Sequence, residues 1–346
     1  MASLDVETRP VPPTVLDANY DKRLMVAAGR SSQDLGARIA DRLGVRLTNP
    51  GLKTFSNGEI YCRFEESIRG ADIFLVQSTA GNAGAGLTAN DALVELLIMI
   101  DAAVGASAHR VIAVTPWYGY SRQDKKSAPR EPISARLVAR MLETAGISRV
   151  LTMDLHAGQL QGFFSAQTPV DHMTALPMLS QYVHDQLGEA SELVIVAPDA
   201  GRVKLTRNFA RKVGAPYALM EKERPAHGVA EIGRVIGDVK GKVAVIVDDM
   251  IDAGGTLAAA ARTVMDEGAR EVYAVATHGV FSGNAFENLT DSPLSGIVVT
   301  DTIPISESAP EMIRVISTAD LLTESIRKIF TDDSVSEIFA GENQLF

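Results

Sequence analysis

The sequence predicts an α/β protein built from two doubly wound parallel-sheet domains, and three observations support this fold class. Apolar runs of strand length alternate along the chain with longer segments in which apolar residues recur at helical spacing. The strand-like runs are of the buried type that is typical of parallel sheets covered by helices on both faces. The pattern occurs in both halves of a 346-residue chain, a length that favours two domains over one.

Each half supplies its own set of expected elements. In the first half, we expect strands at residues 23–28, 71–77, 110–115 and 149–155, and a helix at 88–104. In the second half, we expect strands at 193–197, 243–247, 270–276 and 296–300, and helices at 200–213 and 257–268. In such sheets, ligands bind beyond the carboxyl ends of the strands, so polar residues that follow an apolar strand are candidate site residues.

These elements predict the domain organisation. We expect a first domain at residues 22–166 and a second at 167–304, with the apolar segment at about 305–330 packing back on the first domain. Residues 1–21, which contain several Pro and Asp residues, are predicted to be a disordered extension.

Composition and charge limit the kinds of partner. Apolar residues make up 46% and charged residues 22% of the chain, as in a soluble globular protein. A net charge of −10, without Lys/Arg runs interleaved with aromatic residues, argues against nucleic acid as a ligand. The chain lacks the ~20-residue apolar stretch of a membrane helix and the pattern of a signal peptide, so we expect a cytoplasmic protein without a membrane partner. A small molecule is the expected ligand, and an anionic one needs local basic groups or a metal.

The strongest local signal is the segment 243–256, in which a buried strand ends in two adjacent acids and a glycine-containing turn follows. The two glycines allow backbone N–H groups to approach a phosphate, and Thr256 is placed to cap the next helix. Asp248 and Asp249 do not favour a phosphate, but they accept hydrogen bonds from vicinal hydroxyls. The segment therefore predicts a ribose phosphate site. The alternative is a plain turn before a capped helix, which we disfavour because paired acids at a buried strand end are costly without a ligand.

This segment resembles the phosphoribosyl diphosphate (PRPP) binding motif of the type I phosphoribosyltransferase fold, and the resemblance implies domains of that kind. It assigns the sugar and its 5-phosphate to Asp248, Asp249, Asp252, Ala253, Gly254, Gly255 and Thr256. Many relatives carry Thr where this chain has Ala253, so one hydroxyl contact to the phosphate is lost while the backbone cradle remains.

Six further segments narrow the resemblance. They are Phe-Ser-Asn-Gly-Glu at 55–59, Tyr-Ser-Arg-Gln-Asp-Lys-Lys at 120–126, Arg-Glu-Pro-Ile-Ser at 130–134, Asp-Leu-His-Ala-Gly-Gln at 154–159, Pro-Asp-Ala-Gly at 198–201 and Lys-Glu-Arg-Pro at 222–225. In this order they are similar to ribose-phosphate pyrophosphokinases (PRPP synthetases) of the class I type. The similarity extends from about Leu24 to Phe339.

The resemblance implies an ATP site made from two of these segments. Phe55 offers a ring face for adenine, while Asn57, Gly58 and Glu59 form the polar part of the same loop. Many relatives carry Asp where this chain has Asn57, and Asn retains an acceptor. The resemblance also places Arg122 and Gln123 on ATP, the former through its guanidinium on phosphate oxygens. Taken alone, the first loop is more typical of an ordinary turn and the second of a solvated surface loop.

The remaining segments imply metal binding and catalysis. By resemblance, His156 and Asp199 help to hold Mg²⁺, and Asp199 is chemically the more natural ligand because Mg²⁺ prefers oxygen. Strand alternation predicts that Asp154 points the same way as His156 and orients its ring. Lys222 is the first catalytic candidate and Arg224 its partner, which also touches ribose 5-phosphate. Without the resemblance, the pattern around Lys222 and Arg224 is more typical of a salt-bridged surface hairpin.

The activity implied by the resemblance is transfer of the β,γ-diphosphate of ATP to the 1-hydroxyl of ribose 5-phosphate. The products are AMP and PRPP, a precursor for nucleotide, histidine and tryptophan biosynthesis. Two alternatives stay open: a phosphoribosyltransferase, which uses the same sugar-phosphate loop, and a non-catalytic regulatory member of the same family. The family also implies a homo-oligomer, often a hexamer, in which the adenine loop of one subunit serves the ATP site of its neighbour.

Overall fold

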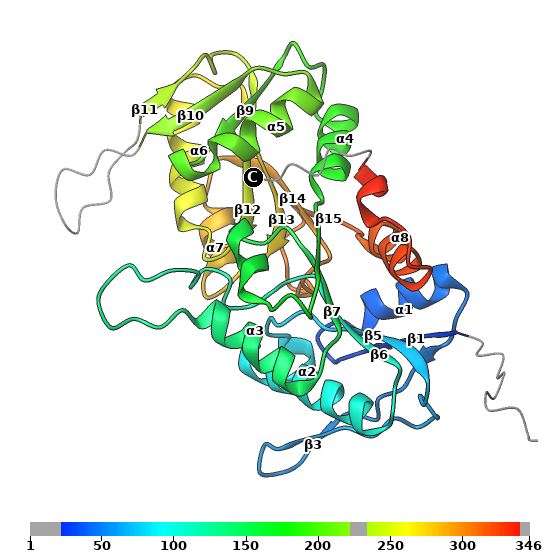
Figure 1. Cartoon of the computed structure of the whole chain (residues 1–346). Coiled ribbons are helices and arrows are strands. Elements are labelled where there is room, and N and C mark those ends of the chain that lie inside the picture. The colour runs from blue at the N-terminus through cyan, green and yellow to red at the C-terminus, as the bar shows by residue number, and fades with distance from the viewer. Residues whose placement is uncertain (1–21, 222–233, 340–346) are drawn as a thin grey trace, which may run out of the picture.

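The computed structural model describes residues 22–221 and 234–339, which form two sheets flanked by helices (Figure 1). The predicted class, an α/β fold with two parallel-sheet domains, is confirmed. In the described ranges, no helix is long and apolar enough to cross a membrane.

The first sheet has six parallel strands in the order β2–β1–β5–β6–β7–β8. These strands are β1 (Arg23–Ala28), β2 (Leu47–Thr48), β5 (Ala71–Val76), β6 (Arg110–Thr115), β7 (Arg149–Met153) and β8 (Val170–Met173). Helix α1 (Gln33–Leu43) covers one face, while α2 (Ala89–Gly105) and α3 (Ser134–Ala145) cover the other. A separate hairpin consists of β3 (Lys53–Thr54) and β4 (Ile60–Tyr61).

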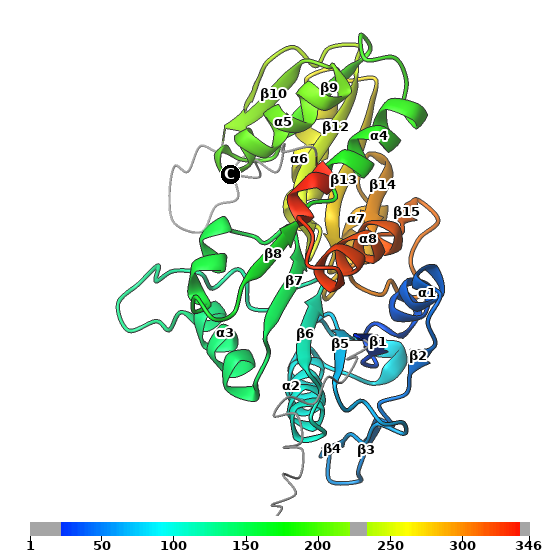
Figure 2. The ribbon, with the colours of Figure 1, turned by 45° about the vertical axis from the view of Figure 1, so that its right-hand side comes forward.

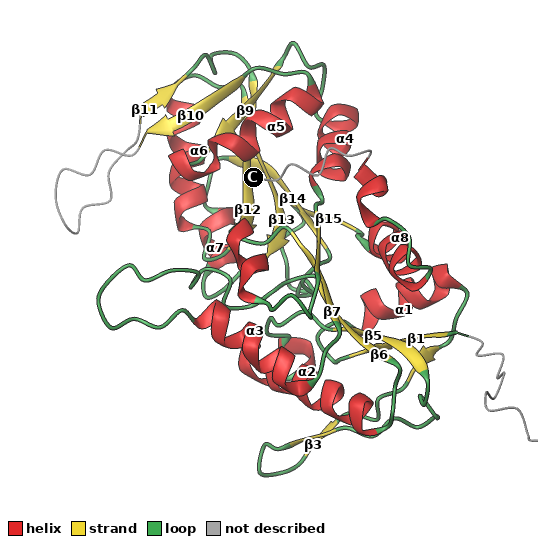
Figure 3. Cartoon of the chain, viewed as in Figure 1, coloured by secondary structure: helices red, strands yellow, loops and turns green. Residues whose placement is uncertain are grey.

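The second sheet has seven strands in the order β11–β10–β9–β12–β13–β14–β15, and all but the edge strand β11 are parallel. They are β9 (Leu193–Ala197), β10 (Tyr217–Glu221), β11 (Arg234–Ile236), β12 (Val243–Ile251), β13 (Glu271–Gly279), β14 (Leu294–Thr300) and β15 (Ile313–Ile316). Its helices are α4 (Leu176–Gln186), α5 (Val203–Val213), α6 (Gly255–Asp266) and α7 (Ala285–Thr290), followed by α8 (Ala319–Phe330). Figure 3 shows the two groups of strands and the helices around them.

Local sequence explains where the helices begin and end. Helix α2 starts with a capping box, because the Thr88 hydroxyl accepts from the Asp91 N–H and the Asp91 carboxylate accepts from the Thr88 N–H. Helix α1 buries Leu35 and Ile39 one turn apart and ends at Gly44, whose φ of 70° lies in the left-handed region. The amphipathic pattern therefore determines which face of each helix meets a sheet.

Sheet membership differs from the expected domain limits at two places. Strand β8 lies beyond the expected end of the first domain at residue 166, yet it pairs with β7 in the first sheet. Within 305–330, which we expected to pack on the first domain, β15 instead pairs with β14 of the second sheet. Short strands carry no signal for which open sheet edge they join, so only the tertiary structure decides this. Helix α8 does pack against α1, where Arg42 pairs with Asp320.

One apolar core is shared by the two sheets. Its buried residues come from β1, β5, β6, β7 and β8 of the first sheet, from β9, β12, β13 and β14 of the second, and from α1, α4, α5 and α8. Figure 2 shows α8 beside α1, with α4 above it along the same side of the molecule. Because the apolar residues of this core are buried only when both sheets contribute to it, packing fixes the position of one sheet relative to the other.

A polar junction joins the sheets where β7 ends. We call Asp154, His172, Thr277 and His278 the sheet junction. The Asp154 carboxylate accepts from the Ala175 N–H at 2.8 Å and from the Thr277 hydroxyl at 2.6 Å. The Asp154 carbonyl accepts from His278 Nε2 at 3.1 Å. His172 Nε2 accepts from the backbone N–H of Leu155 at 2.8 Å. The sheet junction thus links β7 and β8 to β13.

The histidines of the sheet junction predict an acid-labile fold. Burial lowers the pKa of His172 from 6.5 to about 4, so the unfolded chain takes up a proton below pH 6.5 that the folded protein refuses. Stability is therefore complete above pH 6.5 and should fall by up to about 3 kcal/mol as the pH approaches 4. Thermal unfolding across this range measures the loss.

The variant His172→Gln provides the comparison. It should melt at a lower temperature than the wild type at pH 8, because an acceptor for the Leu155 N–H is disturbed, but it should lose less stability between pH 6.5 and 5. His184→Gln, at an exposed position of α4, is the control and should keep the wild-type slope. An unchanged slope in His172→Gln would contradict the assignment.

Candidate active site

The centre of the candidate site is a group of four charged or polar side chains that we call the Arg202 cluster: Asp248, Asp249, Arg202 and His156. Asp248 and Asp249 lie near the carboxyl end of β12, and Arg202 ends the short 3-10 turn before α5. Arg202 Nε is 2.7 Å from Asp248 Oδ1, and Arg202 Nη2 is 2.7 Å from Asp249 Oδ1. One guanidinium therefore faces both acids, each through one oxygen.

The two acids differ in how far they are engaged. Asp249 is 7% exposed in its side chain and uses its second oxygen, Oδ2, to contact His156 Nδ1 at 2.7 Å. Its Oδ1 is buried and lies off the hydrogen-bond direction of the guanidinium, so the contact with Arg202 there is an ion pair. Asp248 is 31% exposed in its side chain. Asp248 is therefore the acid that is better placed to meet a ligand.

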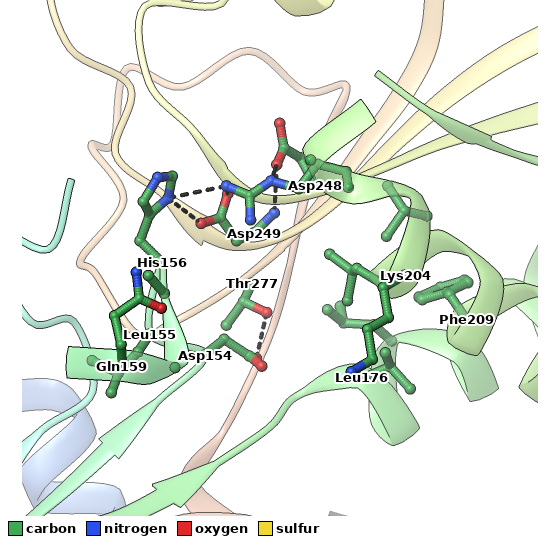
Figure 4. A pocket seen from close by; sticks show the side chains of 17 residues that line it. Asp154, Leu155, His156, Gln159, Leu176, Lys204, Phe209, Asp248, Asp249 and Thr277 are labelled. Atoms are coloured by element: carbon green, nitrogen blue, oxygen red, sulfur yellow. Dashed lines mark hydrogen bonds and ion pairs between the residues drawn. The ribbon is translucent and has the colours of Figure 1, made fainter. Parts of the chain in front are cut away.

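The contacts also determine which nitrogen of His156 carries its proton. Nδ1 lies 2.7 Å from Asp249 Oδ2 and 3.0 Å from Arg202 Nη2. A guanidinium only donates and an ionised carboxylate only accepts, so Nδ1 satisfies just one of them. A bare Nδ1 would set two lone pairs against each other at 2.7 Å, and we therefore assign the proton to Nδ1. Nε2, on the other side of the ring, is left as an acceptor or metal ligand (Figure 4).

Electrostatics separate the two acids further. Burial by itself raises the pKa of Asp249, but the hydrogen bond from His156 and the charge of Arg202 hold that pKa well below its usual range. Burial, and after it the neighbouring Asp249 carboxylate, raise the pKa of Asp248. Asp249 is thus the permanently charged member of the pair.

A cavity of about 270 Å³ lies beside the cluster. Its walls come from the segment after β7, from α4 and α5, and from the ends of β12 and β13 (Figure 4). His156, Arg202 and both acids line it on one side, and Leu176 and Phe209 add apolar surface. The loop at 252–256 does not line this cavity, so the predicted sugar-phosphate residues divide between the cavity and the loop.

That loop forms the start of α6 as expected, with one correction. The helix begins at Gly255, and Gly254 rather than Thr256 occupies the N-cap position, with no side-chain hydrogen bond to the cap. Gly254 has a φ of 76°, and a Cβ there would lie 2.9 Å from Leu289 Cγ, so this position requires glycine. Ala253, Gly255 and Thr256 are exposed, and the first-turn N–H groups of a helix have no partner within it. The geometry suits an anion.

Arg122 connects the loop to the first sheet. It lies in the segment after β6 and pairs with Asp252 of the loop, which also accepts from Ser282. Gln123 accepts from the Ser134 hydroxyl at 2.6 Å, which fixes it against the start of α3. The structure therefore brings one predicted ATP residue and one predicted sugar residue together from different sheets.

The predicted adenine residues lie elsewhere in the chain. Phe55, Asn57, Gly58 and Glu59 form the exposed turn of the β3–β4 hairpin, and Asn57 Oδ1 accepts from the Glu59 N–H. Phe55 is 45% exposed and packs edge-on against Tyr61. Figures 1 and 2 show this hairpin at the end of the first domain that lies away from β12. Within one chain, the hairpin and the Arg202 cluster are not brought together.

The donor set suits Mg²⁺ with few protein ligands. In the described ranges, no group of three His, Cys, Asp or Glu residues forms a metal centre. Mg²⁺ usually keeps several waters and is held by one or two protein groups together with substrate phosphates. Asp199 and His156, the predicted ligands, both contact Arg202: its backbone N–H donates to the Asp199 carbonyl at 3.2 Å, and its guanidinium lies 3.0 Å from His156 Nδ1. This arrangement fits such a site.

Two expectations about individual residues have different outcomes. Asp154 does not orient His156, since it turns into the sheet junction with a φ of 33°, and Asp249 takes that place instead. Strand alternation failed here because β7 ends at Met153, before either residue. Lys222 and Arg224, the predicted catalytic pair, lie outside the described residues.

Arg202 was not among the predicted site residues. The signal was a cation three residues after Asp199, at the start of a helix that follows a buried strand. A basic side chain at that place is more often a solvated helix residue, and the sequence does not show that it reaches the acids of another strand.

Fold and site together define a class, that of two-domain α/β proteins with an anion-suited glycine loop at the carboxyl end of a central strand. Comparison with known proteins is more specific. Residues 24–146 match the model of the N-terminal domain of ribose phosphate pyrophosphokinase, and residues 206–340 match the phosphoribosyl synthetase-associated domain. The chain belongs to the ribose-phosphate pyrophosphokinase family.

Individual relatives support this assignment over nearly the whole chain. A ribose-phosphate pyrophosphokinase of Caldanaerobacter subterraneus subsp. tengcongensis is 48% identical over 324 residues, which cover 93% of this chain and 99% of the relative. One from Nostoc sp. is 47% identical over 330 residues, covering 94% and 97%. The crystal structure of phosphoribosylpyrophosphate synthetase from Mycobacterium smegmatis matches with a TM-score of 0.83 and 43% identity, covering 90% of this chain and all of that one.

The unequal burial of the two acids predicts unequal effects of substitution on stability. Asp249→Asn should destabilise the protein by about 2–3 kcal/mol, because it leaves Arg202 and His156 without their buried counter-charge. Asp248→Asn, at the more exposed acid, should cost less than about 1 kcal/mol. Chemical denaturation of the two variants and the wild type at neutral pH measures the difference, and equal losses would contradict the distinction between the acids.

Proposed function

We propose that this chain transfers the β,γ-diphosphate of ATP to the 1-hydroxyl of ribose 5-phosphate, releasing AMP and PRPP. One observation carries the proposal beyond family membership: Arg122 of the nucleotide segment pairs with Asp252 of the sugar-phosphate loop. This ion pair joins a residue expected on ATP to a residue expected on the sugar. The alternative hypothesis, a phosphoribosyltransferase, gives no role to the nucleotide segments, and we therefore favour diphosphate transfer over it.

The acceptor is held by the loop and by one acid. The N–H groups at the start of α6 bind the 5-phosphate, and Gly254 keeps the backbone close enough to do so. Asp248 and Asp252 accept from the sugar hydroxyls. Asp249 keeps both oxygens on Arg202 and His156, so it supports the sugar through its neighbours and not by direct contact.

The donor is held across the junction of the sheets. The guanidinium of Arg122 leaves Asp252 to take ATP phosphate oxygens, and Gln123 contacts the nucleotide. Asp199 and His156 would hold Mg²⁺, which would supply charge neutralisation for the transferred phosphates. Lys222 and Arg224 stabilise the charge that spreads over the diphosphate as AMP leaves. Positioning and electrostatics do most of the work in such a transfer, so no strong general base is required.

The adenine hairpin serves the ATP site of a second copy. Support comes from its exposure and from its place at the end of the first domain that lies away from β12 (Figure 1). Lys53 lies 5.2 Å from the Phe55 ring and 4.5 Å from the Tyr61 ring, which stiffens the aromatic turn. We extend this to a class I homo-oligomer, a hexamer with shared ATP sites, that works in the cytoplasm.

Purified protein with ATP, Mg²⁺ and ribose 5-phosphate should form AMP and PRPP in equal amounts. The reaction is followed by ³¹P NMR, in which the β,γ-diphosphate appears on the sugar. Lys222→Ala should lower kcat about 10²–10³-fold, because one preorganised cation is removed from the transition state. Release of ADP in place of AMP, or a requirement for a nucleobase, would rule out the proposed reaction.

A shared site predicts complementation between two weak variants. Phe55→Ala damages the hairpin that a subunit offers to its neighbour, whereas Lys222→Ala damages the site that a subunit contains. When the two variants are unfolded together and refolded as mixed oligomers, some sites combine an intact hairpin with an intact lysine. Activity at low ATP should rise above that of either variant refolded alone. Simple averaging of the two activities would show that each chain uses its own hairpin.

A further inference from the structure

Arg202 occupies a place that is normally suited to a metal ion. Its guanidinium has three neighbours: Asp248 Oδ1 at 2.7 Å, Asp249 Oδ1 at 2.7 Å and His156 Nδ1 at 3.0 Å. Two carboxylate oxygens are ligands that divalent cations accept in proteins, whereas the third neighbour, Nδ1 of His156, carries the proton assigned above. The side chain of Arg202 is only 18% exposed, so the guanidinium is enclosed by these groups. Asp248 and Asp249 belong to the second sheet and His156 follows a strand of the first, and Arg202 contacts all three.

The charges explain why a cation is needed there. With both acids ionised and a neutral imidazole, the Arg202 cluster carries one net negative charge, and without the guanidinium it would carry two on adjacent residues. Two carboxylates side by side attract a divalent ion strongly in a partly buried setting. An ion held there would occupy the acid oxygens that a hydroxylated ligand needs.

We propose that Arg202 is the resident cation of the Arg202 cluster and keeps divalent metal off the Asp248–Asp249 pair. Within the described ranges, its contact with Asp248 uses Oδ1 and leaves the other carboxylate oxygen to a ligand, while its charge offsets one of the two negative charges of the pair. It also holds Asp249 against Nδ1 of His156, so any metal that His156 binds is directed to Nε2. Arg202 is therefore a positioning residue that separates the sugar-binding acids from the metal. That these acids bind a sugar rests on the proposed function, but the exclusion of metal does not.

The test is direct binding of Mn²⁺ to the full chain without substrates, measured by electron paramagnetic resonance and calorimetry. Arg202→Met removes the charge and keeps much of the length of the side chain. It should bind one more Mn²⁺ per chain than the wild type, with an affinity about 10- to 100-fold above any binding at this place in the wild type. Arg202→Lys keeps a positive charge and should bind no additional ion.

Two controls locate the additional ion. Arg207→Met removes an exposed arginine from the same helix, α5, and should leave Mn²⁺ binding unchanged. The double variant Arg202→Met/Asp249→Asn removes one expected ligand and should lose the additional ion again. Circular dichroism establishes that each variant is folded before binding is compared.

The outcomes separate this inference from the proposed function. An Arg202→Met protein that is folded and takes up no additional Mn²⁺ would overturn the role of Arg202, even if the wild type makes PRPP. Equal uptake by Arg202→Lys would overturn it as well, because charge would then not be the cause. In the catalysed reaction, the KM of Arg202→Met for ribose 5-phosphate should rise with free Mg²⁺, while that of Arg207→Met stays constant. If the wild type makes no PRPP, the function fails while the Mn²⁺ result stands.

Discussion

The structure depends on the sheet junction, where the Asp154 carboxylate links the end of β7 to β13 of the second sheet. Asp154 accepts from Thr277 and from the Ala175 N–H, and its carbonyl accepts from His278. These groups are largely buried, so leaving any of them unpaired would be costly. Asp154 lies two residues before His156. By fixing Asp154 against the second sheet, the sheet junction also brings the segment after β7 to the end of β12. The shared apolar core then holds this arrangement in place.

The candidate site is a consequence of that meeting. Asp248 and Asp249 come from the second sheet, His156 follows a strand of the first, and Arg202 precedes helix α5, which packs on the second sheet. A compact group of opposite charges at such a boundary is stable only when each member is paired. The pairing also gives the members different roles: Asp249 is fully engaged, whereas Asp248 keeps an oxygen for a ligand.

The residues that we propose to contact nucleotide and sugar lie in distant parts of the chain. Arg122 reaches Asp252 across the two sheets, but the Phe55 turn remains exposed on its own hairpin. An aromatic ring held by Lys53 and Tyr61 on a protruding turn is suited to recognition by stacking. Under our proposal of shared ATP sites, the hairpin of one chain completes the nucleotide site that Arg122 of a second chain begins.

The sequence by itself determined the α/β class, most central strands, the glycine-dependent loop at 254 and the family. These depend on local patterns: apolar runs, helical spacing, and a φ that only glycine adopts easily. It did not determine which sheet β8 and β15 join, that Asp154 turns away from His156, or that Arg202 faces both acids. Those features depend on groups that are far apart along the chain and are placed by packing of two sheets on one core. The spacing of residue types along the sequence does not predict which distant groups meet, so only the tertiary structure decided these features.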